Sequence, residues 1–460
     1  MKIFEQNLNS KFETTGRWTN SLDDIHQDGN YGRLIYEKGN IYVELFDFPY
    51  SKEQDLNVLY GINSDGMCFE LINPLILKQK KDYFSGLILI ADAMIVGKEF
   101  IKDRKFNRVN FTTEEYNEWI YKSPIKYQDD FVKLSREEYS QKITMVKAHK
   151  LKIYDYIKGT EFSNKDGVFI NTEKCLSMKF EDSIDMCRLL NYAHSLKNLT
   201  GILMNSPIDF KWIEFKTNEG GSNSQFRYFF SQNNVEPSKL KIKGIFYQDI
   251  EDNLDVIINN WFEKRDKLEA IEQVLIHNET LLTFLDTKLI DVIKALEIYH
   301  RNFVESIEKD ISEEEGLSRD RETLNKFIES NIENAEYFQG KVNHIDQNVT
   351  LSKRLQELLK SLPAEVIENY IKEEEKSSNR SIKTFANKLT ETRNSYIHAD
   401  DIKRYPNAFK TNDEFSDILV KLRDIIWYLC LKEIKVSEEL IRNNLFPTKI
   451  EFQNLPFDSY

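Results

Sequence analysis

The sequence predicts an α+β protein, with a β-rich N-terminal domain that contains one inserted helix, followed by an all-α helical bundle. Fourteen of the 16 glycines precede residue 245, and glycine marks turns while helices avoid it. Runs of β-branched and aromatic residues alternate with turn signals in the same region. The last 200 residues instead carry apolar stripes with the period of a helix. We therefore expect two domains, residues 1–255 and 256–460.

The clearest strand signal is a hairpin over residues 32–46, where β-branched and aromatic runs flank Lys38-Gly39-Asn40. One helix, at 183–197, interrupts the β-rich region because apolar residues recur there at helical spacing. We expect further strands at 67–77, 83–98, 106–111, 142–156, 167–172, 176–180, 209–216 and 225–231.

The second half contains two strong helical stripes, over 285–308 and 413–433. Leucine, isoleucine, valine and phenylalanine recur there every three or four residues, which suits an antiparallel bundle. The full set of helices expected in this half is 252–262, 268–282, 285–308, 319–332, 351–362, 364–371, 380–398, 413–433 and 437–443.

Composition limits the classes of partner. The net charge of −13 disfavours nonspecific binding to nucleic acid or to an anionic membrane, so RNA requires a local basic patch. No apolar stretch reaches the length of a membrane span. The four cysteines lack CxxC spacing and no secretory signal pattern is present, which indicates a reducing cytoplasm and four buried thiols.

The sequence gives no support for a metal or cofactor site. The seven histidines are dispersed without an HExxH motif, and Gly220-Gly221 is not followed by the Lys-Ser/Thr of a phosphate-binding loop. We expect no metal and no cofactor.

The most informative stretch is residues 392–400, near the end of the helix expected at 380–398. Arg393 falls on the apolar face of this helix, and a buried guanidinium needs an anion because it cannot lose its charge. That anion is either a carboxylate, for which Glu297 is our candidate, or a phosphate of a ligand. The apolar stripe that defines this face comprises Ile382, Phe385, Ala386, Leu389, Tyr396 and Ile397.

His398 lies five residues after Arg393, which turns it by about 140° around a helix. The two side chains therefore belong together only at a helix end or at the seam of a dimer. Residues 376–410 contain eight Lys or Arg against three acidic residues, a local excess of positive charge. A structural alternative remains open, in which Arg393 pairs with Glu297 or another carboxylate and His398 caps a helix.

These residues resemble a known superfamily. A glycine-poor helical domain with Arg393, Asn394 and His398 in the pattern R-N-x-x-x-H is similar to the HEPN superfamily, whose nuclease members share this motif. Gly16-Arg17-Trp18 and residues 32–46 resemble the opening of the ApeA-type N-terminal domain, which precedes a HEPN domain in bacterial anti-phage proteins. Residues 295–301 resemble an early helix of ApeA-like HEPN domains. Asp400 departs from the pattern of some HEPN toxins, which have tyrosine there.

The resemblance implies a metal-independent endoribonuclease of an abortive-infection system. His398 would act as base or acid, Arg393 would bind the phosphate, Asn394 would orient phosphate or ribose, and Glu297 would support the site. One histidine per chain does not supply both acid and base, so we expect a cytoplasmic homodimer with a composite cleft for RNA, formed through the HEPN domain. The N-terminal domain would then sense a phage-derived trigger.

Two other functions remain open. In the first, the helical half that resembles HEPN is a non-catalytic nucleotide-binding or dimerisation module, and the β-rich half does the recognition. In the second, the protein is a β-sandwich that binds glycan or peptide and carries a helical stalk.

Overall fold

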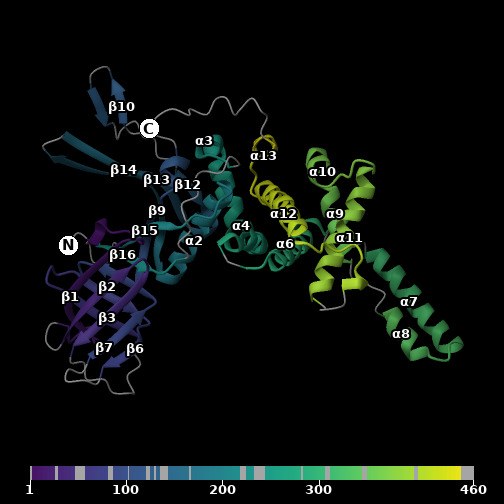
Figure 1. Ribbon diagram of the computed structural model, residues 1–460, viewed down its shortest axis with the longest axis horizontal. Coiled ribbons are helices and arrows are strands. Elements are labelled where there is room, and N and C mark those ends of the chain that lie inside the picture. The colour runs from purple at the N-terminus through teal and green to yellow at the C-terminus, as the bar shows by residue number, and fades with distance from the viewer. Residues whose placement is uncertain are drawn as a thin grey trace. The chain divides into compact units, whose positions relative to one another are not determined.

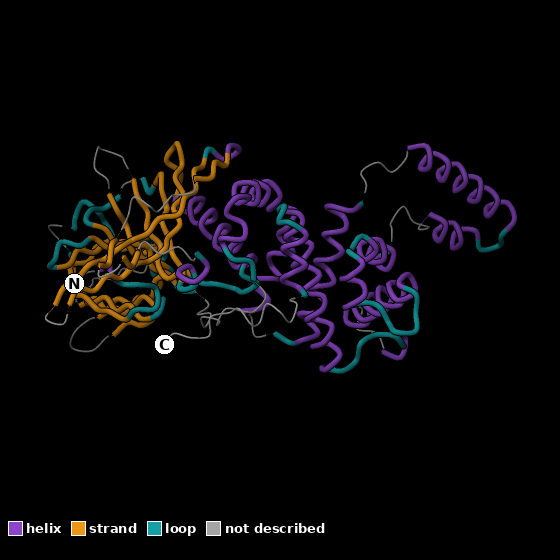
Figure 2. The backbone as a smooth tube through the Cα atoms, turned by 90° about the horizontal axis from the view of Figure 1, so that it is seen from above, coloured by secondary structure: helices purple, strands orange, loops and turns teal. Residues whose placement is uncertain are grey.

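The computed structural model describes residues 3–25, 29–46, 57–80, 86–101, 103–120, 125–128, 131–134, 143–164, 167–217, 224–232, 244–280, 283–305, 311–343, 350–397 and 402–446. Strands and helices occupy different parts of the chain (Figure 2), which confirms the α+β prediction. Two compact units are present. One comprises Met1–Glu263 and Leu431–Tyr460, and the other Lys264–Cys430. The boundary that we placed at 255/256 stays a prediction.

The first unit is built on an antiparallel sheet whose strands are labelled in Figure 1. Within the described residues its order is β12-β13-β14-β9-β15-β16-β8-β5-β4-β1-β2-β3-β7-β6, and β10 pairs with β11 alone. The strands are β1 (Lys11–Thr19), β2 (Asn30–Glu37), β3 (Asn40–Phe46), β4 (Val58–Asn63), β5 (Cys68–Ile72), β6 (Leu75–Lys80), β7 (Gly86–Ala91), β8 (Ala93–Gly97), β9 (Lys105–Thr113), β10 (Ile125–Gln128), β11 (Phe131–Leu134), β12 (Ile143–Val146), β13 (Leu151–Asn164), β14 (Gly167–Asp185), β15 (Phe210–Thr217) and β16 (Ser224–Phe230).

The hairpin expected at 32–46 is confirmed as β2 and β3. Lys38 and Gly39 connect the two strands with φ angles of 48° and 87°. Positive φ at both positions gives the turn a twist that matches the twist of the strands, and glycine adopts it without strain.

Several strand boundaries differ from the prediction. The runs expected at 67–77 and 83–98 are each divided, into β5 and β6 and into β7 and β8. Asn73 has φ 49° and precedes a proline, so the first run turns there. Conversely, the segments expected at 167–172 and 176–180 form one strand, β14. Apolar content predicts strand character better than it predicts where a strand bends.

One tryptophan determines how closely β1, β2 and β4 approach one another. Trp18 is fully buried and lies opposite Gly61 of β4. A Cβ atom on Gly61 would lie 2.3 Å from the indole ring, and one on Gly32 would lie 2.9 Å from it. The two glycines therefore leave the space that the indole occupies, which gives part of the N-terminal motif a structural role.

A row of buried polar residues crosses the sheet on neighbouring strands. Ser177 Oγ donates to Asn110 Oδ1 at 2.7 Å, and Asn110 Nδ2 donates to Glu214 Oε1 at 3.2 Å. Arg227 lies opposite Glu214, packs 4.7 Å from the ring centre of Trp212 and donates to the carbonyl of Phe4. Burial lowers the pKa of Arg227. The row runs across four adjacent strands, β14, β9, β15 and β16, which are thus linked by side chains as well as by the backbone.

Helix α2 (Met186–Leu203) is the helix expected at 183–197. It begins where the Asp185 side chain accepts a hydrogen bond from the backbone N–H of Arg188 at 2.9 Å, an ordinary N-cap. It packs on β9 and β14, and Trp261 Nε1 donates to Ser195 Oγ at 2.8 Å. Shorter helices of this unit are η1 (Ile3–Glu5), α1 (Tyr116–Trp119), η2 (Lys147–His149), α3 (Tyr247–Ile250), η4 (Glu251–Asn253) and α13 (Glu438–Leu445).

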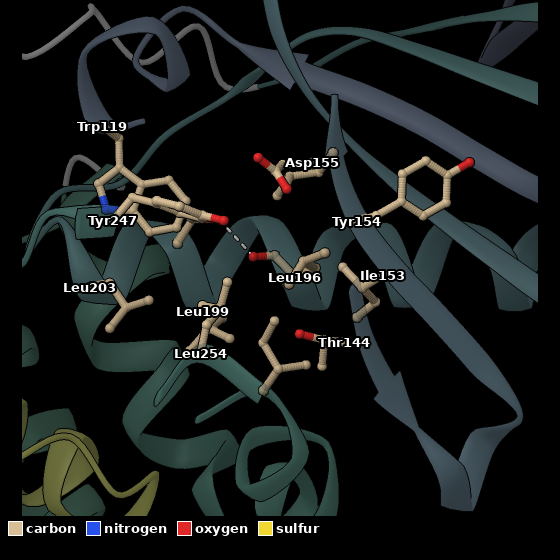
Figure 3. A pocket seen from close by; sticks show the side chains of 13 residues that line it. Trp119, Thr144, Ile153, Tyr154, Asp155, Leu196, Leu199, Leu203, Tyr247 and Leu254 are labelled. Atoms are coloured by element: carbon tan, nitrogen blue, oxygen red, sulfur yellow. Dashed lines mark hydrogen bonds between the residues drawn. The ribbon is translucent and has the colours of Figure 1, made fainter. Parts of the chain in front are cut away.

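A small internal cavity lies beside α2 (Figure 3). Its volume is about 20 Å³, room for about one water molecule. Leu196, Leu199 and Leu203 of α2 line one side of it. Burial, and next the charge of Asp155, raises the pKa of Tyr247, so this phenol stays protonated. The cavity is a packing feature and has no room for a larger ligand.

The second unit is helical, and its boundaries with the first unit fall inside α4 and α12. The helices expected at 252–262 and 268–282 are one continuous helix, α4, that ends in a π-helical turn, η5. A second π-helical turn, η6, ends α6. Helices α7 and α8 lie side by side (Figure 1). The described helices are α4 (Leu254–Glu272), η5 (Gln273–His277), α5 (Asn278–Thr280), α6 (Leu285–Tyr299), η6 (His300–Val304), α7 (Ile311–Asn331), α8 (Ala335–Asn343), α9 (Leu351–Lys360), α10 (Ala364–Tyr370), α11 (Ser378–Ile397), η7 (Ile402–Arg404) and α12 (Asn412–Glu433).

The cysteines correct one expectation. Cys68, Cys175 and Cys430 are buried, but Cys187 is exposed. Cys187 lies in the first turn of α2 on the side away from the sheet, whereas the adjacent Met186 is buried. None of the helices in the described part combines the length and apolar character needed to cross a bilayer.

We expect native protein to react with a thiol reagent such as DTNB fast at one position, Cys187. Burial raises the pKa of Cys68 to about 11 and that of Cys175 to about 12, so neither supplies thiolate at pH 8. Replacing Cys187 by Ser should abolish the fast phase, and unfolding should then release three slower thiols. A fast phase that persists in the variant would contradict the burial of the others.

Replacing Gly61 by Ala should lower the melting temperature by several degrees, because the added methyl group overlaps the Trp18 ring and overpacking of a core costs about 1–3 kcal/mol. Gly159 of β13 is the matched control, since a Cβ there would meet nothing within 4 Å. Scanning calorimetry of the two alanine variants tests this. Equal melting temperatures would show that the indole does not set the strand spacing.

Candidate functional site

Helix α11 carries Arg393 and Asn394 in its last turns. The expected continuation of its apolar stripe through Tyr396 and Ile397 is wrong, because these residues are 37% and 43% exposed. The helical period instead carries the buried face from Leu389 to two hydroxyl residues and turns Tyr396 and Ile397 toward solvent. The buried positions of α11 are Ser381, Ile382, Ala386, Leu389, Thr392 and Ser395.

Both hydroxyls on the buried face have hydrogen-bond partners. Thr392 Oγ1 donates to the carbonyl of Lys388 at 2.8 Å, and Ser395 Oγ donates to the carbonyl of Thr392 at 2.7 Å. Bonds of this kind to the preceding turn let Ser and Thr lie inside a helical interface without an unsatisfied polar group. The end of α11 is therefore polar, buried and fixed.

Arg393 lies beside this polar face and is half-buried. Its Nη1 donates to Oδ1 of Asn394 at 3.1 Å. Within the described residues, Nε is buried without a hydrogen-bond partner and the guanidinium forms no ion pair. A buried donor of a charged group is costly to leave unpaired. Arg393 and Asn394 together therefore offer a positive charge and a side-chain amide, a combination suited to binding an anion.

Glu297 has a different partner from the one that we predicted. Its carboxylate forms an ion pair with Arg301, one turn further along the helix. The charge of Asp286, near the start of α6, acts on Tyr396 in the last turn of α11. Eleven residues of helix separate Asp286 from Glu297, roughly 16 Å. Among the described residues no ion pair joins Glu297 to Arg393, and the supporting role of Glu297 stays a prediction.

His398 lies outside the described residues, directly after α11. The structure brings Arg393 and Asn394 together but does not describe where the imidazole lies relative to them. The role of His398 stays a prediction.

Two residues of α11 fasten the segment that follows the site. Glu391 accepts hydrogen bonds from the backbone N–H of Asn407 at 2.9 Å and from its Nδ2 at 2.8 Å. Thr392 Oγ1 accepts from the backbone N–H of Phe409 at 2.9 Å. We call these three bonds the 391–409 clamp. They hold together the two ends of the stretch that contains Arg393, Asn394 and His398.

Further side chains around the clamp are basic or aromatic. Lys388 Nζ lies 5.9 Å from the ring centre of Phe409, within the range of a cation–π contact. The Tyr396 and Phe415 rings pack edge to face at 6.1 Å. Burial, followed by the charge of Asp286, raises the pKa of Tyr396, so the exposed phenol is a hydrogen-bond donor near neutral pH. The end of α11 thus has a lysine and a phenol near it, together with the Glu391 carboxylate of the clamp.

A second polar cluster has a structural character. His300 is fully buried in η6, and its Nε2 lies 2.9 Å from Oε2 of Glu357 in α9. Nearby, Arg354 Nη1 donates to Glu305 at 2.7 Å. These contacts join the end of α6 to α9. The described residues include no group of three or more His, Cys, Asp or Glu arranged to hold a metal ion.

No pattern in the sequence predicts the clamp. Its bonds join residues 16 and 17 positions apart, and no helical or strand period relates such positions. Only the arrangement of α11 against the following segment reveals it.

Replacing Thr392 by Val should weaken the clamp, because the amide of Phe409 loses its acceptor while side-chain shape is kept. An unpaired buried donor costs about 1–3 kcal/mol. Thr390 is the matched control, since its hydroxyl donates to Ala386 one turn back and accepts no clamp bond. Hydrogen exchange by mass spectrometry should show faster exchange over residues 405–411 in T392V than in T390V. Equal rates would contradict the clamp.

Comparison with known families agrees with the two-part architecture. The family model for the ApeA N-terminal domain 1 matches residues 13–261, more than half of the chain. The model for the Apea-like HEPN domain matches residues 290–440, a range that includes Arg393, Asn394 and His398. No curated protein and no solved structure matches the chain. The chain belongs to the ApeA-type family of anti-phage proteins, in which an ApeA N-terminal domain precedes a HEPN domain.

Proposed function

We propose that this protein is a metal-independent endoribonuclease that cleaves host or phage RNA during infection. The observation that carries the proposal is the Arg393 guanidinium, half-buried at the end of α11 with an unpartnered Nε–H among the described residues. HEPN domains include ribonucleases, and Arg393 lies inside the HEPN match. A fixed cation of this kind suits a phosphodiester.

The proposed reaction needs a base, an acid and a cation. A neutral imidazole takes the proton of a ribose 2′-hydroxyl, and the oxygen attacks the adjacent phosphorus. The bond from phosphorus to the 5′-oxygen breaks, and that oxygen takes a proton from an imidazolium. The products are a 2′,3′-cyclic phosphate and a 5′-hydroxyl, so no external oxidant, reductant or nucleophile is consumed.

Each residue of the motif has a role in this reaction. His398 acts as base or acid. Arg393 binds the phosphate and stabilises the charge that develops on its oxygens. Asn394, whose Oδ1 accepts from Arg393 Nη1, orients the guanidinium and leaves its Nδ2 for phosphate or ribose.

We propose that two chains form the active site. One motif provides one imidazole, whereas the reaction needs one to accept and one to donate a proton. Residues on the exposed rim of α11, Tyr396 and Ile397, would then meet the partner. The composite arrangement is a C2 dimer through the HEPN domain, the commonest symmetry for soluble homo-oligomers.

We also propose that the β-rich domain senses a phage-derived trigger and restrains the nuclease in the cytoplasm until then. Uncontrolled cleavage of cellular RNA would stop growth, so activity must depend on infection. The runner-up function, a non-catalytic HEPN module beside a β-rich recognition domain, differs in one respect: it does not require the motif to be intact.

The test uses full-length wild type, R393A and H398A expressed in bacteria, with and without phage infection. We expect RNA cleavage after infection by wild type alone. Loss of a donor that stabilises a transition state costs about 10²–10³ in rate, and loss of a general base about 10²–10⁴. R380Q is the matched control, because Arg380 is exposed on the same helix and should leave cleavage unchanged.

Sequencing RNA ends measures both the position and the chemistry of the cut. Cyclic phosphate ends that appear with purified protein in chelator would support the mechanism. Folded motif variants that still protect cells against phage would favour the non-catalytic module instead. Cleavage by wild type at full rate without infection would contradict restraint by the N-terminal domain.

A further inference from the structure

A second candidate site lies in the first unit, far along the sequence from the HEPN motif. A cavity of about 350 Å³ opens on the face of β1, β2 and β4 opposite to Trp18. Its volume falls at the lower end of the range for small-molecule sites. The cavity is lined by Thr15, Gly16, Arg17, Ile25, Tyr31, Ile62, Asn63 and Ser64.

Arg17 and Tyr31 form the polar rim of this cavity. They lie directly opposite each other on β1 and β2. The guanidinium carbon is 5.4 Å from the centre of the Tyr31 ring, and Nη2 donates to the phenol oxygen at 3.2 Å. Tyr31 is 62% exposed. An aromatic ring and a cation are thus held together at the surface, and the bond to Tyr31 uses one of the five guanidinium N–H groups.

Arg33, on the same face of β2, serves as a comparison for Arg17 because it has partners within the protein. It forms an ion pair with Glu13 and lies opposite Glu44 of β3. Its bond with Glu13 and the charges of Glu13 and Glu44 raise its pKa. Arg17, by contrast, forms no ion pair with any carboxylate of the described part of the chain.

The remaining walls are apolar or preorganised. Ile25 is buried to 1% exposure and forms the base of the cavity with Ile62. Asn63 Oδ1 accepts from the backbone N–H groups of Asp65 and Met67 at 3.0 and 2.9 Å. These bonds fix the turn beside the cavity. The cavity therefore combines a fixed apolar base with one aromatic face and one cation.

We propose that this cavity binds a mononucleotide, with its phosphate on Arg17 and its base against Tyr31. Bases stack on exposed tyrosines, and a guanidinium suits phosphate oxygens. The cavity has room for one such unit. The net charge of −13 disfavours a long polyanion but leaves a single phosphate group acceptable at a local cation. The site contains none of the residues of the HEPN motif.

Isothermal titration calorimetry of the full-length protein with AMP, GMP, CMP and UMP tests the proposal. We expect at least one nucleotide to bind, with a dissociation constant about tenfold or more below those of inorganic phosphate and of the matching nucleoside. R17Q and Y31L should each weaken binding about tenfold or more. R33Q is the matched control and should bind like wild type, because Arg33 is engaged by Glu13.

Both Arg17 and Tyr31 are exposed, so the variants should fold, and circular dichroism with the melting temperature checks this. Absence of binding by all four nucleotides at millimolar concentration would overturn the proposal, as would unchanged binding by R17Q. Inorganic phosphate binding as tightly as the nucleotide would exclude base recognition and also overturn it. Calorimetry needs no RNA cleavage, so these outcomes are separate from the test of the nuclease.

Discussion

A guanidinium keeps its charge at any pH a cell reaches, so every arginine that the fold withdraws from water needs an anion, a carbonyl or an aromatic face. Arg227 meets this constraint only in part inside the sheet, against Trp212 and the carbonyl of Phe4, since among the described residues its Nε and Nη1 are buried without a hydrogen-bond partner. Arg33 meets it with Glu13. Arg393 also meets it only in part, through Asn394, whereas Arg17 is exposed to water and donates to Tyr31. Arg393 and Arg17, one in each unit, are the two arginines for which we propose a phosphate ligand.

Local signals in the sequence predict most elements of the fold. Glycine distribution separates the β-rich part from the helical part, and the Lys38-Gly39 turn, α2 and α12 are where periodicity and turn chemistry place them. Strands β1 and β4 escape prediction because glycine interrupts both. Gly61 of β4 leaves room for Trp18, and Gly16 of β1 lies against the backbone of Ile62. The turn at Asn73 can be predicted from the proline that follows it, but only if that proline is given more weight than the run of apolar residues around it.

Part of the candidate site can likewise be predicted from the sequence. The motif identifies Arg393 and Asn394, and the family matches include both. Their partners depend on tertiary structure. Glu297 borders the right stripe but forms its ion pair with Arg301 of the same helical segment, and a stripe gives no information on the register between helices. Tyr396 and Ile397 are apolar enough in sequence to be predicted on the buried face, yet Thr392 and Ser395 are buried instead. Their hydroxyls tolerate burial because they bond to backbone carbonyls of the helix.

The first unit is discontinuous, since its last segment begins at Leu431 after the whole of the second unit. On the ribosome, the chain from 264 to 430 emerges before the piece that completes the β-rich unit. Domains generally fold as units during synthesis, so the helical unit gains its structure while its neighbour is still incomplete. Translation that stopped before Leu431 would therefore leave the first unit without its last segment, and it would also leave the region that matches HEPN, residues 290–440, without its end.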